Sequence, residues 1–147
     1  MHKEQLFKAL ETAIAETAEH LIFQDLVEVR QEPLGNGFTE DDFQVMIKIL
    51  QPFKAKLFLF YQKAFADQLV TEMVGENIEY FEQVIDGLKE LSNTIAGKFM
   101  ANYVQKERFK IGLPNCTQRP FDLVTPQAQI FNFYFDETHI GALLHEE

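Results

Sequence analysis

The hydrophobic positions near the start of the chain recur every three or four residues. This period predicts an amphipathic helix over residues 3 to 21, whose apolar side consists of Leu6, Leu10, Ala13, Ile14, Thr17 and Leu21. A shorter segment with the same period contains Ala66, Leu69, Val70 and Met73. Glycine is the residue most often found just past the end of a helix, so we expect this second helix to end near Gly75.

A longer helix is expected from about Ile78 onward. One continuous hydrophobic stripe predicts its buried face, and the stripe consists of Phe81, Val84, Ile85, Leu88, Leu91, Ile95, Phe99 and Tyr103. Four other residues lie roughly opposite this face, namely Asp86, Glu90, Asn93 and Gly97. Their spacings of four, three and four residues place them within a stripe about 60° wide on the helix surface. We call these four residues the polar stripe.

The hydrophobic period changes to two after residue 42. It predicts a hairpin whose first strand carries Phe43, Val45, Ile47 and Ile49 on one face and whose second strand runs from Lys56 to Tyr61. Three further extended segments are expected, at Phe109 to Leu113, Gln129 to Phe135 and Ile140 to Leu144. These strands come mostly in pairs that are adjacent in the sequence, which is typical of an antiparallel sheet.

The remaining segments have no regular hydrophobic period. Residues 22 to 32 are irregular, and residues 33 to 42 and Pro114 to Pro126 are rich in turn formers, so the last two are expected to be loops. The order of helices and strands predicts an α+β fold with helices packed on one face of an antiparallel sheet. A chain of 147 residues has the length of one domain, and we expect a single domain over residues 1–147.

The charge of the chain excludes several classes of partner. The formal net charge is −10, and the lysines and arginines form no cluster, so nucleic acid and anionic membrane surfaces are not expected to bind. No run of residues approaches the roughly 20 apolar residues of a membrane helix. The N-terminal segment is charged and amphipathic, whereas a signal peptide needs an unbroken apolar run, so we expect a cytoplasmic protein.

Other residue types that often carry chemistry lack suitable partners in the sequence. The histidines, His2, His20, His139 and His145, do not have the mutual spacing of metal ligands, so no metal site is expected in this chain. The single cysteine, Cys116, excludes an intramolecular disulfide, and as a nucleophile it would need a histidine beside it. The glycines at 35 and 37 do not form a phosphate-binding loop, and the acidic run at 40 to 42 is interpreted as a solvated turn.

The polar stripe allows two interpretations. The simpler one is a solvated face, which nearly every surface helix has opposite its core face. However, Asn is a mediocre helix former, and Gly97 inside a helix costs roughly 1 kcal/mol relative to Ala. A bare, flat patch of this kind suits a helix that the backbone of another protein approaches closely.

The segment from Asp86 to Gly97, DGLKELSNTIAG, resembles the active helix of the CheX, CheC and FliY family of chemotaxis phosphatases. The family pattern is an Asp or Ser, three residues, a Glu, two residues, an Asn and, further on, a Pro. Asp86, Glu90 and Asn93 match in order, and Pro114 follows Asn93 after 20 intervening residues, slightly closer than the family spacing. The resemblance extends to KLFLFYQKAFADQLVTEMVGE before this helix and to FKIGLP after it.

The number of motifs distinguishes the members of this family. CheC and FliY carry two motifs, whereas each of the other asparagines in this chain lacks a Glu three residues before it; they are Asn36, Asn77, Asn102, Asn115 and Asn132. One site per chain is similar to CheX. The resemblance implies a CheC-like fold, an antiparallel sheet with two long helices packed on it. It also implies a homodimer, and the strand at 129 to 135 supports this because both its faces are largely apolar and a small sheet gains from pairing edges across a two-fold axis.

The resemblance further implies a specific activity, hydrolysis of the phosphoryl group on the aspartate of a CheY-like response regulator. In this family the Glu pairs with a lysine of the regulator and the Asn amide positions the attacking water, roles that fall here on Glu90 and Asn93. Asp86, Glu90 and Gly97 are then the residues that contact the partner, with Asp86 shaping the helix face. The resemblance implies no cofactor in this chain, and Mg²⁺ would belong to the regulator.

Two alternatives stay open. A related module could bind a phosphorylated response regulator without catalysis, as a scaffold or sink, although the retention of both Glu90 and Asn93 favours the phosphatase. A structural component related to FliY is disfavoured because the second motif is missing. 

Overall fold

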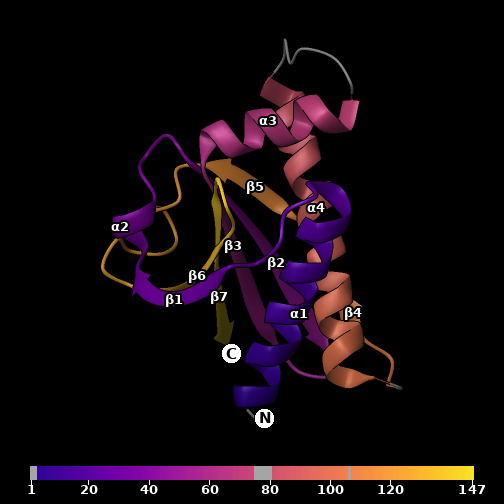
Figure 1. Cartoon of the computed structure of the whole chain (residues 1–147). Helices are drawn as coiled ribbons and strands as arrows, with labels where there is room; N and C mark the ends of the chain where they lie inside the picture. The colour runs from indigo at the N-terminus through magenta and orange to yellow at the C-terminus, as the bar shows by residue number, and fades with distance from the viewer. Residues whose placement is uncertain (1–2, 75–80, 106) are drawn as a thin grey trace.

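A computed structural model describes residues 3–74, 81–105 and 107–147 of the chain. Within these residues one antiparallel sheet of seven strands has the order β1-β6-β7-β3-β2-β4, and β5 also pairs with β2 (Figure 1). The strands are β1 (Glu28–Pro33), β2 (Phe43–Gln51), β3 (Ala55–Tyr61), β4 (Lys110–Ile111), β5 (Asn115–Gln118), β6 (Gln129–Tyr134) and β7 (His139–Glu146). The helices are α1 (Lys3–Leu21), α2 (Leu34–Gly37), α3 (Lys63–Val74) and α4 (Phe81–Val104).

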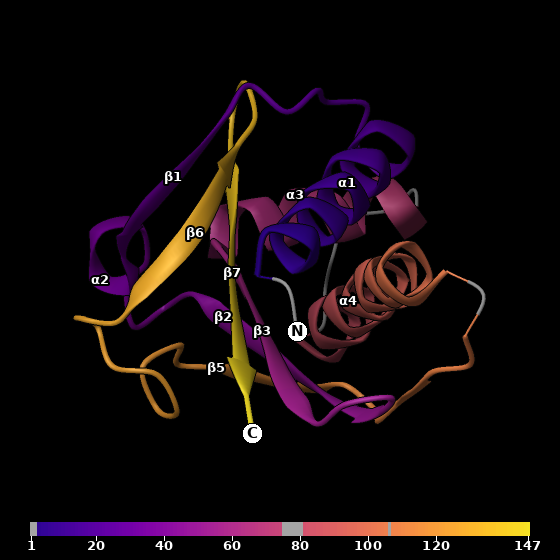
Figure 2. The same cartoon turned by 90° about the horizontal axis from the view of Figure 1, so that it is seen from below.

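The two long helices cover one face of the sheet. Figure 2 shows α1 and α4 side by side on this face, with α2 on the other side of the sheet. The apolar sides of both helices and the inward residues of β2 and β3 form the main core, which includes Ile14, Val45, Leu59, Ile95 and Phe99. The expected α+β architecture, with two long helices on an antiparallel sheet, is confirmed.

A smaller core lies on the opposite face of the sheet. It consists of Leu34, Phe38, Phe58, Phe60, Val124 and Ile130, and it is covered by α2 and by the segment that follows β5. The backbone N–H groups of Leu34 and Gly35 donate to the carbonyls of Ala128 and Pro126, at 2.8 Å each, and these bonds hold α2 against that segment. The sheet is therefore apolar on both faces along part of its width.

The two cores explain why β6, which lies in the segment that was expected to favour a homodimer, has apolar residues on both faces. β6 lies between β1 and β7, so both of its edges are paired within the chain. Phe133 belongs to the main core and Ile130 to the smaller one, which accounts for apolar residues on both faces of the strand. β6 therefore has no free edge that could pair across a two-fold axis, contrary to what was expected of this strand, and the expectation of a homodimer rests on the family resemblance alone.

Three segments without a hydrophobic period contain regular structure. Residues 28 to 32, expected to be irregular, form the strand β1 together with Pro33, while α2 occupies part of the expected loop at 33 to 42. β5 lies within the expected loop at 114 to 126. β1 and β5 are short and polar, and their pairing with β6 and β2 uses backbone groups, which no side-chain pattern reveals.

The acidic run at 40 to 42 is only partly a solvated turn. Glu40 and Asp41 are exposed, but Asp42 is 7% exposed. One carboxylate oxygen of Asp42 accepts the backbone N–H of Thr39 and the other accepts that of Lys63, both at 2.8 Å. Because Lys63 is the first residue of α3, Asp42 satisfies a free donor at the start of that helix.

The hairpin, the strands near 129 to 135 and 140 to 144, and the helix at 3 to 21 are confirmed. Gly75 and the expected start of the long helix near Ile78 lie outside the described residues. One member of the predicted buried stripe was assigned wrongly, because Phe81 is 52% exposed. It lies at the first described residue of α4, where its ring contacts only Phe43, at 5.8 Å between ring centroids, among the described aromatic residues.

Candidate functional site

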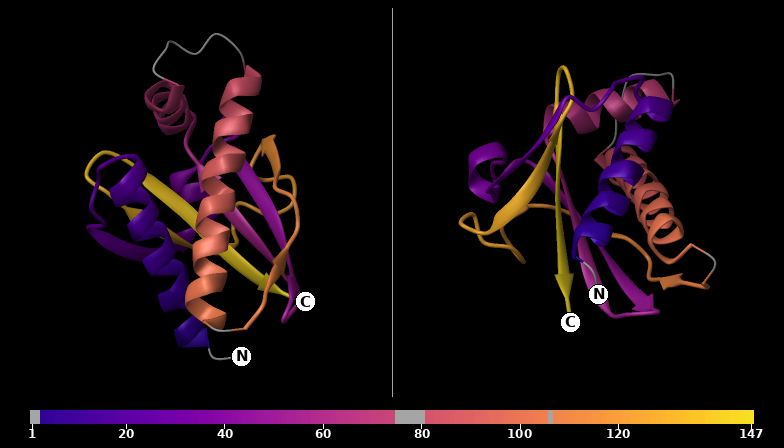
Figure 3. Two further views of the ribbon diagram at one scale, coloured as in Figure 1. Left: turned by 90° about the vertical axis from the view of Figure 1, so that its right-hand side faces the viewer. Right: turned by 60° about the horizontal axis from the view of Figure 1, so that its bottom comes forward.

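The polar stripe lies on the outward face of α4. Asp86, Glu90 and Asn93 are exposed and Gly97 is half-buried. Leu88, Leu91 and Ile95 of the same helix are buried in the main core. The helical phase expected from the sequence is therefore confirmed in the middle of α4. Figure 3, left, shows the helix in front of the sheet, flanked by α1 on one side and by the segment with β4 and β5 on the other.

A buried hydrogen bond connects the inner side of α4 to the sheet. The Tyr61 hydroxyl of β3 and the Ser92 hydroxyl of α4 are 2.8 Å apart, and both residues are 0% exposed. Burial raises the pKa of Tyr61 well above its ordinary value, so the phenol stays protonated at physiological pH. Ser92 directly precedes Asn93, and it was not singled out from the sequence because a serine in a helical stretch carries no recognisable signal.

A glycine allows α3 to pack closely on α4. A Cβ atom added to Gly87 would lie 2.4 Å from Cγ2 of Val70 in α3, so no side chain fits at this position without a shift. Gly97 differs, because a Cβ there would meet no heavy atom within 4 Å. Gly87 is thus required by packing inside the chain, whereas nothing among the described residues explains a glycine at position 97.

The polar groups of the stripe are free to meet another molecule. Among the described residues, the side chains of Asp86, Glu90 and Asn93 take part in no hydrogen bond or ion pair within the chain. The Thr94 hydroxyl donates to the backbone carbonyl of Glu90 at 3.1 Å, a bond within the helix that leaves the carboxylate of Glu90 unused. The Glu90 carboxylate and the Asn93 amide lie one helical turn apart on this exposed face. The carboxylate can accept hydrogen bonds from a cationic side chain, and the amide can orient a water molecule.

Pro114 lies between β4 and β5, in the segment that runs along α4 (Figure 3, left). Cys116 in β5 is half-buried against the main core. Burial raises the pKa of the Cys116 thiol to about 12, although nearby Lys89 of α4 opposes the shift. A thiol with such a pKa is a poor nucleophile at neutral pH.

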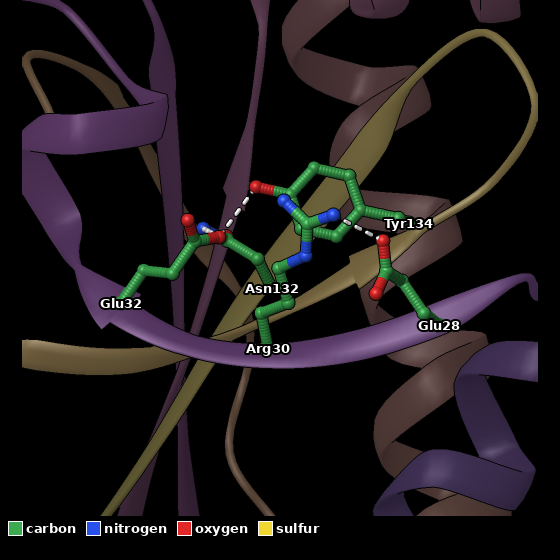
Figure 4. Close-up of polar contacts among 5 residues, drawn as sticks. All are labelled: Glu28, Arg30, Glu32, Asn132 and Tyr134. Atoms are coloured by element: carbon green, nitrogen blue, oxygen red, sulfur yellow. Dashed lines mark hydrogen bonds and ion pairs between the residues drawn. The ribbon is translucent and has the colours of Figure 1, made fainter.

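A second polar cluster, which the sequence did not indicate, connects side chains of the edge strand β1 with those of its neighbour β6 (Figure 4). The Glu32 carboxylate accepts hydrogen bonds from the Tyr134 hydroxyl and from the Asn132 amide, the latter at 3.1 Å. These two bonds, in that order, lower the pKa of Glu32. Arg30 lies over the Tyr134 ring, 5.0 Å from its centroid, and pairs with Glu28.

His139 of β7 belongs to this second cluster. Its ring stacks on that of Tyr134 with centroids 5.0 Å apart, and its Nε2 lies 3.1 Å from the Gly37 carbonyl. Burial lowers the pKa of His139, so the neutral ring donates from Nε2 to that carbonyl. The strands β1 and β6, which carry most of this cluster, lie away from α4 (Figure 2).

Residues 3–74, 81–105 and 107–147 contain no group of three or more His, Cys, Asp or Glu side chains arranged to hold a metal ion, and His2 lies outside them. None of the helices in these ranges has the length and hydropathy needed to cross a membrane.

The sequence profile of the family described as "Chemotaxis phosphatase CheX" matches residues 43–135, a range that contains the polar stripe and Pro114. No curated protein sequence matches the chain.

Several solved structures are similar over nearly the whole chain. A CheC-like superfamily protein from Shewanella sp. PV-4 has a TM-score of 0.75 at 15% identity, and the match covers 100% of this chain and 99% of that one. A chain of the CheX-CheY-BeF3-Mg complex from Borrelia burgdorferi has a TM-score of 0.74 at 14% identity, with 95% and 96% covered. The chemotaxis protein CheX from Vibrio vulnificus has a TM-score of 0.74 at 12% identity, with 97% of each chain covered. The shared fold confirms the CheC-like architecture.

Proposed function

Because the chain belongs to the CheX family of chemotaxis phosphatases, we propose that it hydrolyses the phosphoryl group on the aspartate of a CheY-like response regulator. The observation that carries this proposal is the polar stripe, whose acid and amide are exposed on a helix that is fixed by a packed core. The solved complex of CheX with CheY, BeF3 and Mg from Borrelia burgdorferi supports the choice of partner.

Asn93 is the residue to which we assign the chemical step. In the reaction a water oxygen bonds to phosphorus, the bond from phosphorus to the acyl oxygen breaks, and the products are the aspartate carboxylate and inorganic phosphate. An acyl phosphate is already reactive, so holding the water in line is the main contribution left to the enzyme. The Asn93 amide can donate and accept at once without adding charge beside a phosphate.

The other residues of the polar stripe are assigned to docking. Glu90 lies on the same exposed side as Asn93, where its unused carboxylate can pair with a lysine of the regulator. Asp86 extends the stripe by one turn and shapes the face. The open space over Gly97 lets a partner backbone come close, so Gly97→Leu is expected to weaken binding although it raises helix propensity.

Three further features belong to this proposal. We assign any Mg²⁺ in the complex to the regulator, and no cofactor to this chain. The protein is proposed to act in the cytoplasm, with its partner. The family resemblance also leads us to propose a homodimer in solution.

The test is the decay of a phosphorylated regulator with and without this protein. Asn93→Ala is expected to slow the decay by on the order of a hundredfold, about 2.7 kcal/mol, because its contribution arises in the transition state. Its affinity for the regulator carrying a stable acyl-phosphate mimic is expected to change little. Glu90→Ala is expected to weaken both affinity and rate, and its effect on affinity shrinks as salt rises.

The same measurements separate the phosphatase from a module that only binds the regulator. A binding module lengthens or leaves unchanged the lifetime of the phosphorylated regulator, while Glu90→Ala still lowers the affinity. If Asn93→Ala dephosphorylates a cognate regulator as fast as the unmodified protein, the catalytic assignment is wrong and the binding module becomes the better account.

A further inference from the structure

α4 carries one polar side chain into the main core. Among the described residues of α4, Ser92 is the only buried polar one, and its partner across the interface is the Tyr61 hydroxyl at 2.8 Å. The same two elements, α4 and β3, contribute hydrophobic residues to the main core, among them Leu59, Leu88 and Ile95. Because both residues are fully buried, no water competes for this hydrogen bond. Each hydroxyl would therefore lose its hydrogen-bond partner if the other moved away.

Hydrophobic packing by itself defines the rotation of a helix loosely. Apolar burial is non-directional, so it resists a small rotation of a helix about its own axis less sharply than a directional bond does. A side-chain group on a helix lies about 5 to 6 Å from the axis, so a rotation of α4 by about 20° would move the Asn93 amide by about 2 Å. A displacement of about 1 Å can already cost a catalytic group about a hundredfold.

A buried hydrogen bond is directional and selects one rotation. Any turn of α4 that separates the two hydroxyls leaves the Tyr61 phenol buried without a partner, which is costly. We propose that the Tyr61–Ser92 hydrogen bond sets the rotation of α4 and thereby positions the Asn93 amide for the attacking water. This inference rests on the function proposed for Asn93, and it makes Tyr61 and Ser92 positioning residues that do not contact the substrate.

The single variants Tyr61→Phe and Ser92→Ala differ in whether the remaining hydroxyl can find another hydrogen-bond partner. After Tyr61→Phe, the Ser92 hydroxyl can turn to the backbone carbonyl one helical turn earlier, as serines in helices often do. Ser92→Ala removes the one partner that the Tyr61 hydroxyl has in hydrogen bonds among the described residues. Ser92→Ala is therefore expected to destabilise the protein more than Tyr61→Phe, whereas the double variant leaves no stranded hydroxyl and is expected to unfold near the temperature of the unmodified protein.

The deciding variant is the double change Tyr61→Phe with Ser92→Ala. It is expected to lower kcat for the phosphorylated regulator at least tenfold and to change KM less than twofold, because the long Glu90 side chain tolerates a shift of α4 better than a positioned amide does. The side-chain amide signals of Asn93 in a ¹⁵N–¹H NMR spectrum, identified by their loss in Asn93→Ala, are expected to shift or broaden. Thr17→Val is the matched control, because the Thr17 hydroxyl is also buried but donates within α1, to Ala13 at 2.7 Å.

The outcomes separate this inference from the proposed function. A stable double variant with unchanged kcat and unchanged Asn93 signals overturns the inference, as does a loss of kcat that only follows the folded fraction. Thr17→Val giving the same loss of kcat overturns it too. If the unmodified protein does not dephosphorylate the regulator, the proposed function fails, yet shifted Asn93 signals in the double variant alone would still support the positioning role.

Discussion

Two glycines on α4 provide a controlled test of the packing described above. Gly87→Ala and Gly97→Ala add the same methyl group to the same helix, and each is expected to gain about 1 kcal/mol from the higher helix propensity of Ala. The surroundings differ, because the added Cβ at Gly87 would lie 2.4 Å from Cγ2 of Val70, whereas the one at Gly97 meets nothing within 4 Å.

The propensity gain is common to both variants, so their difference measures the steric cost at Gly87. Val70 is 1% exposed and β-branched, so its side chain has little freedom to move away. Overpacking of a core costs about 1 to 3 kcal/mol. For a chain of this size, about 2 to 4 °C in Tm corresponds to 1 kcal/mol, so Gly97→Ala is expected to melt roughly 2 to 12 °C above Gly87→Ala.

Thermal melts followed by circular dichroism provide the assay, with Val70→Ala added in both backgrounds. Removing the two γ-methyl groups of Val70 creates room at Gly87, so Val70→Ala is expected to cost less stability in the Gly87→Ala background than in the Gly97→Ala background. Equal melting temperatures for the two glycine variants, with no coupling to Val70, would refute the close packing of α3 on α4 as the reason for Gly87.

The remaining predictions concern stability, pH and assembly. Leu91→Ala removes a buried side chain and is expected to lower the free energy of unfolding by about 2 to 5 kcal/mol, whereas Asn93→Ala on the exposed face is expected to lower it by much less. Chemical denaturation measures both values, and the reverse order would contradict the predicted helix phase. The pKa of Glu32 is lower in the folded state than its ordinary value of 4.5, so its contribution is present above pH 4.5 and is lost as the pH falls through the folded value. The difference in Tm between the unmodified protein and Glu32→Gln is therefore expected to shrink from pH 7 to pH 3, and a difference that stays constant would exclude this ionised contact. A homodimer predicts twice the chain mass of 17.1 kDa in light scattering at tens of micromolar protein, and a monomer mass would count against it.

The elements that bury one face could be predicted from the sequence. α1, the hairpin of β2 and β3, and the middle of α4 each present apolar residues to the main core at the period of their own backbone. The polar stripe could be located for the same reason, since the phase of the buried residues Leu91 and Ile95 places Asn93 on the outside. Its function could not be read from this pattern, because a solvated helix face has the same composition, and it was suggested only by the family resemblance.

The tertiary structure decided which polar and small residues are structural. Asp42 looked like part of a solvated turn, yet it holds the start of α3. The sequence placed Gly97 on the polar stripe but indicated no role for Gly87, and only the position of Val70 shows that Gly87 is required by packing.

The pairings between distant segments were also beyond the sequence. β1 and β5 have no apolar period because they are edge strands, and backbone hydrogen bonds to β6 and β2 hold them. Ser92 and Tyr61 are 31 positions apart, and either residue alone is ordinary. Periodicity records how each segment buries its own face, whereas a strand register or a hydrogen bond between two elements depends on where the rest of the chain places the partner.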